Sequence, residues 1–94
     1  MMDVTDNTDM RHFEAHVNDA LAIIEYQIQE KKYFLTKVSF PDSLSDEDKD
    51  NMIDATLNMI EETGMRVVPM TRPIKDYFKK NRERRKMLPV GIHL

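Results

Sequence analysis

The stretch from Met10 to Val38, MRHFEAHVNDALAIIEYQIQEKKYFLTKV, decides the fold that we expect for this chain. Its apolar residues recur at alternating spacings of four and three, which is the period of one helical face. The positions that share this period are Val17, Leu21, Ile24, Ile28, Leu35 and Val38. Lys31 fills the one missing step, and no glycine or proline interrupts the run. The pattern predicts a single helix of about 45 Å, and we expect part of this apolar seam to meet another subunit.

The end of this helix has a second interpretation. The segment 33–40, YFLTKVSF, also alternates between apolar and other side chains as a strand does. The segment before it, EYQIQEKK at 25–32, consists largely of good helix formers and contains no turn residue. We therefore expect the helix to continue to about Val38, with a strand over 33–40 as the alternative.

Two further helices are expected after a break at residues 39–45, where Pro41 disfavours a helix. Ser45 and the three acids that follow it are typical of a helix N-terminus, and Gly64 is typical of a helix end. This second helix should fold back antiparallel on the first. A shorter basic helix should then run from about Pro73 to Lys86.

Together these elements predict an all-α fold. A long helix and an antiparallel second helix would form an αα-hairpin, followed by the shorter basic C-terminal helix. Residues 1–8 are expected to be a flexible tail, and residues 9–94 a single helical domain. The alternative is a small α/β fold with strands near 33–40, 65–70 and 88–94.

The composition narrows the class of protein. The 94 residues are 40% hydrophobic and 33% charged, proportions typical of a soluble globular domain. There is no run of 18 apolar residues, and the acidic start lacks the basic and apolar regions of a secretory signal. The lack of cysteine excludes disulfides and thiolate chemistry. We therefore expect a cytoplasmic protein with no membrane association.

The net charge of −3 conceals a division along the chain. Residues 1–64 carry 15 acidic and 5 basic side chains, whereas residues 65–94 carry 9 basic and 2 acidic ones. So basic a C-terminal third indicates an anionic partner. The alternative is that the two halves of the chain pair with each other, within one molecule or across an oligomer.

The best candidate site is this basic C-terminal segment. Cations recur on the expected third helix at spacings of four, three and four, so they would form one stripe. Such a stripe suits a phosphate backbone, and the connector before the helix could hold a phosphate-bearing ligand such as a nucleotide. A solvated charged face is the alternative. The residues assigned to the site are Arg66, Thr71, Arg72, Lys75, Lys79, Arg82 and Lys86.

Other chemistry has little support in the sequence. With only Gly64 and Gly91, the chain lacks a glycine-rich phosphate loop and a Gly-x-Ser-x-Gly nucleophile motif. His12 and His16 are four residues apart and could share a divalent ion on a helix, but we expect them to face water. We therefore predict no catalytic residue, no metal site and no cofactor.

The leading functional hypothesis is a small non-enzymatic interaction protein. The apolar seam and the methionines favour a regulator or inhibitor that binds a protein or other macromolecular partner, as a homo-oligomer. A phage or bacterial origin would suit such a protein. The alternative is a phosphate-binding module for nucleic acid or a nucleotide-like ligand, acting through the basic C-terminal third.

Overall fold

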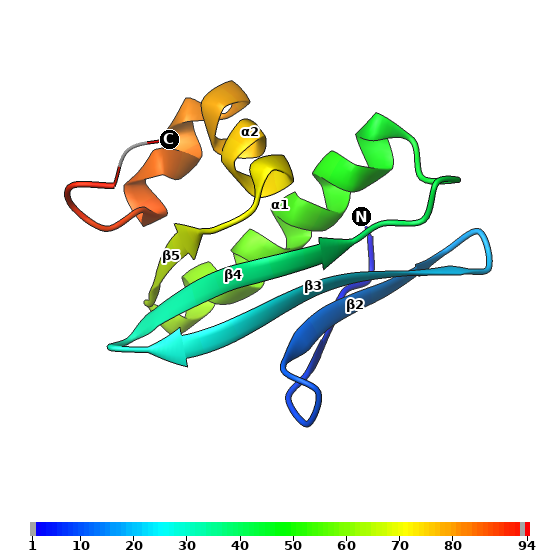
Figure 1. Ribbon diagram of the computed structural model, residues 1–94, viewed down its shortest axis with the longest axis horizontal. Coiled ribbons are helices and arrows are strands. Elements are labelled where there is room, and N and C mark those ends of the chain that lie inside the picture. The colour runs from blue at the N-terminus through cyan, green and yellow to red at the C-terminus, as the bar shows by residue number, and fades with distance from the viewer. Residues whose placement is uncertain (1, 93) are drawn as a thin grey trace.

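The computed structural model describes residues 2–92 and residue 94. In this part of the chain it has five strands, two α-helices and one 3₁₀ helix, labelled in Figure 1 as far as space allows. The elements are β1 (Thr5–Asn7), β2 (His12–Val17), β3 (Ala20–Gln29), β4 (Lys32–Ser39), α1 (Asp46–Thr63), β5 (Arg66–Pro69), α2 (Arg72–Lys80) and η1 (Arg82–Met87). The protein is therefore an α/β fold.

The strands form one sheet in the order β1-β2-β3-β4-β5, so each strand pairs with its neighbour in the sequence. The first four are antiparallel, whereas β4 and β5 are parallel. Parallel neighbours need a long crossover between them, and α1 provides it. Figure 1 shows α1 running behind β4 and β3, with α2 following β5 at the edge of the sheet.

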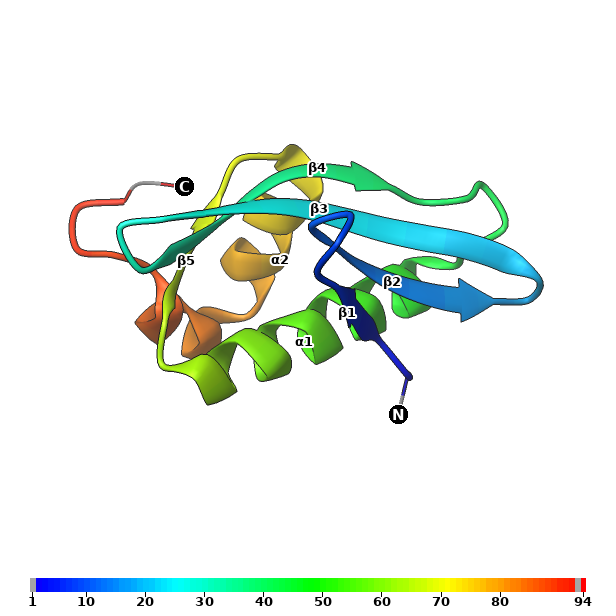
Figure 2. The same ribbon diagram turned by 90° about the horizontal axis from the view of Figure 1, so that it is seen from below.

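The core lies between the sheet and the helices. Figure 2 shows α1 on one side of β3 and β4, and α2 lies beside α1 and β5. Alternate residues of the strands point to this side and pack with one face of each helix into a single apolar cluster. Side chains that are 0 to 1% exposed include Phe13, Ile24, Leu35, Leu57 and Phe78.

The predicted all-α fold and αα-hairpin are wrong, because the stretch 10–38 folds as β2, β3 and most of β4 instead of one helix. Members of the expected seam do not share a face. Ile24 and Leu35 are fully buried, whereas Leu21 and Ile28 are 42% and 46% exposed. The apolar residues follow the period of two of strands, in which every second residue is buried, and the apparent helical period does not determine the structure.

Two tight turns replace the middle of the expected helix. At Asn18–Asp19 the φ angles are 51° and 64°, and at Glu30–Lys31 they are 51° and 61°. Two-residue turns with positive φ at both positions match the twist of hairpin strands. Asparagine and aspartate tolerate this conformation, but glutamate and lysine seldom adopt it. Lys31 therefore marks a turn and not a step of an apolar seam.

The α/β alternative was closer to the structure. Its first two strands, near 33–40 and 65–70, correspond to β4 and β5. Its third strand, at 88–94, is wrong, since no strand occurs in the described residues of that segment. Residues 5–7, expected in a flexible tail, form β1 and pair with β2.

The helix boundaries were predicted better than the strands. The predicted start and end of α1 are confirmed, because Ser45 Oγ accepts a hydrogen bond from the Asp48 amide at 3.0 Å and Gly64 has a φ of 77°. The expected third helix ends early, at Lys80. There Asn81 leaves the helical conformation, with φ −121° and ψ 75°, and both its backbone amide and its side chain donate to the Tyr77 carbonyl at 2.9 Å. The chain continues as η1.

Among the described residues, neither helix has the length and hydrophobicity to cross a lipid bilayer.

Candidate anion-binding site

Five of the nine basic residues of the C-terminal segment fall into two groups with different surroundings. The first group is neutralised by acids of α1, and Arg84 is its most buried member, with a side chain 13% exposed. Arg84 Nη2 lies 2.6 Å from both Asp54 Oδ1 and Asn58 Oδ1. The Tyr77 hydroxyl donates to the same Asp54 oxygen at 2.7 Å. Burial alone would raise the pKa of Asp54, but these hydrogen bonds outweigh it and hold that pKa below its usual value.

Two lysines belong to the same group. Lys80 Nζ lies 3.0 Å from Asp50 Oδ2, and Lys86 Nζ lies 3.3 Å from Glu61 Oε2. These pairs join α2 and η1 to α1. Part of the charge division along the sequence is therefore satisfied by intramolecular pairing.

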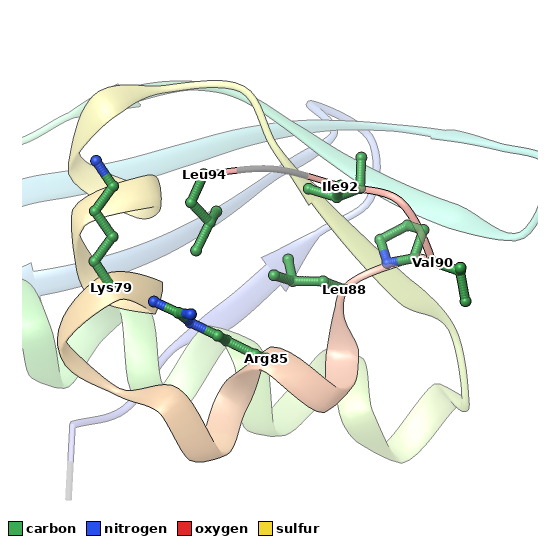
Figure 3. A pocket seen from close by; sticks show the side chains of 7 residues that line it. Lys79, Arg85, Leu88, Val90, Ile92 and Leu94 are labelled. Atoms are coloured by element: carbon green, nitrogen blue, oxygen red, sulfur yellow. The ribbon is translucent and has the colours of Figure 1, made fainter.

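The second group faces a cavity of about 510 Å³ at the C-terminal end of the chain (Figure 3). Its wall is completed by what we call the C-terminal tail, the described residues 88–92 and 94. The lining residues are Lys79 from α2, Arg85 from η1, and Leu88, Pro89, Val90, Ile92 and Leu94 from the C-terminal tail. No Asp or Glu side chain is among these lining residues, and the two charged side chains are both cationic.

Arg85 is held in a defined position in this cavity. Its Nε donates to the backbone carbonyl of Phe78 at 3.2 Å, which fixes the guanidinium against the end of α2. Figure 3 shows the guanidinium pointing toward the Lys79 side chain. Within the described chain no ion pair involves Lys79 or Arg85. Both cations line one space, and neither pairs with an Asp or Glu side chain of the described chain.

Of the seven residues predicted for the site, only Lys79 lines this cavity. The predicted stripe of cations is broken, because the helix ends before Arg82 and Lys86 is paired with Glu61. Arg66 donates to the Lys86 carbonyl and lines a different hollow, together with Glu61 and Lys86. The hydroxyl of Thr71, which precedes α2, is buried without a hydrogen-bond partner.

Arg72 and Lys75 occupy the first turns of α2 and are not among the residues that line the cavity. Sequence reasoning did not assign Arg85, the second cation of the cavity. The sequence feature that could have indicated Arg85 is its place three residues before the apolar Leu88, where the basic segment ends. This feature points to the cavity only when the C-terminal tail is known to return toward α2.

A second concavity, of about 350 Å³, lies between the first turns of α1 and α2, beyond the ends of β4 and β5. Open α/β sheets often bind ligands at the carboxyl ends of parallel strands. Its charges, however, already face one another. Lys80 pairs with Asp50, and the looser pair of Arg72 and Asp76 is separated by 4.0 Å. An anion there would meet carboxylates as well as cations, so the first cavity is the better anion site.

The two histidines considered for a metal lie on β2, not on a helix. His12 is only 8% exposed, and its Nε2 is 2.8 Å from Glu14 Oε1. Asn7 donates to the same oxygen at 3.0 Å, and the hydrogen bonds from Asn7 and His12 lower the pKa of Glu14. No group of three or more potential metal-binding side chains is found in the described residues. His12 thus takes part in a hydrogen-bond network at the sheet surface.

No protein-family model matches the chain, and a search of curated proteins finds no match either. Function has to be inferred from the chemistry of the cavity itself.

Proposed function

We propose that this protein reversibly binds a small anionic ligand of the phosphate class in the cavity between α2, η1 and the C-terminal tail. The observation that carries the proposal is the contrast between neighbouring cations. Lys80 and Arg84 are neutralised by α1, whereas Lys79 and Arg85, their neighbours in the sequence, line a cavity that has no Asp or Glu side chain among its described lining residues. Two cations aimed at one space repel each other, and an anion between them removes that repulsion.

The geometry of Arg85 favours an oxyanion. Its Nε is already bonded to Phe78, so its terminal nitrogens remain to donate to a ligand. Guanidinium groups match the paired oxygens of phosphates and carboxylates, and such charge-assisted hydrogen bonds are about twice as strong as neutral ones. Lys79 adds a flexible point charge on the neighbouring wall. Together the two side chains suit a ligand with two negative charges.

A small ligand fits this arrangement better than a nucleic acid. A phosphate backbone needs an extended row of cations, each neutralising one phosphate. Here the row ends where α2 ends, and three of the nearby cations are paired with α1. The described lining side chains are cationic or hydrocarbon, so the proposal is confined to binding.

The hypothesis of a macromolecular partner and a homo-oligomer loses one of its supports, because the helical seam on which it partly rested is a pair of hairpins in the structure. It stays a prediction, as does the cytoplasmic location.

The proposal is tested by isothermal titration calorimetry with inorganic phosphate at pH 7.5 and constant ionic strength. Lys79→Glu puts a like charge at the site, and it should weaken binding by roughly tenfold or more. The matched control is Arg82→Glu, an equal charge reversal at an exposed position of η1 outside the cavity, which should leave affinity nearly unchanged. Both variants should retain the parent melting temperature. Equal losses in the two variants, or no binding by the parent protein, would contradict the proposal.

A further inference from the structure

β1 forms one edge of the sheet and pairs only with β2. In an antiparallel ladder, the backbone amide and carbonyl of successive residues point alternately to the two sides of the strand. The Tyr26 amide donates to the Arg11 carbonyl at 3.0 Å, so odd-numbered residues in this part of the chain bond to β3 and even-numbered ones bond to β1. The register makes Thr5 and Asn7 the residues of β1 that bond to β2. The amide and carbonyl of Asp6 therefore point to the open edge.

This open edge is held in an extended conformation. The Tyr26 hydroxyl donates to Asp6 Oδ1 at 2.6 Å, and Asn7 Nδ2 donates to Glu14 Oε1 at 3.0 Å, so side chains on both faces fasten β1 to its neighbours. In the described chain, no backbone hydrogen bond joins residues 2–6 to a segment other than β2. Unpaired amide and carbonyl groups at the edge of a sheet are a template for an added strand.

A groove of about 250 Å³ adjoins this edge, between α1 and the segment that leads into β1. Figure 2 shows β1 next to α1. The floor of the groove is apolar, because Met2, Val4 and Met59 are partly buried and pack against the core. A residue opposite Asp6 in an added strand would point to the same face of the sheet, which is the face covered by the helices. The lining residues are Met2, Asp3, Val4, Ala55, Asn58, Met59 and Glu62.

The rim of the groove is acidic. Its two charged side chains, Asp3 and Glu62, are exposed, and neither takes part in an ion pair within the part of the chain that the structure describes. This rim is complementary to a basic ligand. A second copy of the chain fits the edge poorly. Residues 3–9 contain three acids and no base, so two such edges would bring like charges together.

We infer that the open edge of β1 and this groove bind an extended basic peptide segment of a partner protein, which joins the sheet as a further strand. Backbone pairing at Asp6 selects the extended conformation, and cationic side chains meet Asp3 and Glu62. Apolar side chains enter the groove over Met59, whose flexible thioether adapts to different shapes. The site is separate from the anion cavity, with which it shares no described lining residue.

Three capped hexapeptides test the need for backbone pairing and for positive charge. The peptide KVKVKV offers both, its version with N-methylated valines lacks the amides of the residues that would face Asp6, and EVEVEV reverses the charge. In isothermal titration calorimetry at constant ionic strength, KVKVKV should bind saturably, with roughly tenfold or higher affinity relative to either control. Equal affinity for the N-methylated peptide, or no binding of KVKVKV by the folded protein, would overturn the inference.

Two charge reversals on α1 locate the binding site. Glu62→Lys puts a like charge at the groove and should weaken KVKVKV binding about tenfold. Glu47→Lys, an equal reversal at an exposed position in the first turn of the same helix, should leave affinity nearly unchanged. Melting temperatures show that both variants are folded. Equal losses in the two variants would mean that the peptide binds to the acidic surface in general, and the groove would not be its site.

A last measurement distinguishes the peptide from a second copy of the chain. Amide chemical shifts caused by KVKVKV should be confined to residues 4–6 and to residues 55–62 of α1. If light scattering instead finds the free protein dimeric, and the Asp6 amide is protected from hydrogen exchange only in the dimer, a second copy occupies the edge and the inference is wrong.

Discussion

Basic side chains on the two faces of the segment 79–86 have opposite surroundings. Lys80 and Arg84 point to α1 and are neutralised by Asp50 and Asp54. Lys79 and Arg85 precede or follow them by one residue, yet they face the cavity under the tail. Because successive residues are rotated by about 100° in an α-helix and about 120° in a 3₁₀ helix, adjacent cations reach different surroundings. The pairing partner, not the residue type, separates a structural cation from one available to a ligand.

The largest effect should come from truncating the two arginines. Arg84→Ala leaves Asp54 and Asn58 without their charged donor, and it should lower the free energy of unfolding by about 2–3 kcal/mol. Arg85→Ala removes one hydrogen bond to the Phe78 carbonyl and should lower it by about 1 kcal/mol. Urea unfolding at neutral pH measures both. Equal losses of unfolding free energy in the two variants, or a larger loss in Arg85→Ala, would contradict the distinction between the two faces.

A smaller effect should appear in the pH dependence of stability. The folded-state pKa of Asp54 lies below its unfolded value, so its stabilising contribution is present above the unfolded pKa and is lost as pH falls through the folded one. The difference in unfolding free energy between the parent and Arg84→Ala should therefore be full above about pH 5 and shrink below about pH 4. Arg85→Ala should show no such narrowing, since its partner is a backbone carbonyl. If the difference in unfolding free energy stayed constant down to pH 3, the ionised Asp54 would not be the group through which Arg84 stabilises the fold.

How much of this fold could be predicted depended on how local each signal was. Ser45, the acids after it and Gly64 specify α1 through hydrogen bonds within a few residues, and that helix was predicted correctly. The hairpins of β2–β4 carry no comparable signal at Glu30–Lys31, where ordinary side chains adopt positive φ. Sheet pairing supplies the free energy that holds them there, and pairing is not visible in a short window of sequence.

The candidate site shows the same difference between local sequence patterns and contacts of distant segments. Lys79 was assigned from its place on a basic helix, which is a local pattern. Arg85 was counted in the basic segment but not assigned to the site, because its direction depends on the helix break at Asn81 and on a tail that returns to α2. The neutralisation of Lys86 by Glu61 was hidden too, because the partner lies 25 residues earlier on another helix. Which charges remain free is a property of the tertiary structure.

The central claim is most directly tested by mapping where phosphate binds. Inorganic phosphate is titrated into ¹⁵N-labelled protein at constant ionic strength, and amide chemical shifts are followed residue by residue. We predict saturable shifts confined to the end of α2, to Arg85 and to the tail. Shifts centred on the first turns of α1 and α2 around Arg72, or linear shifts spread over all exposed cations, would contradict the assignment of the site.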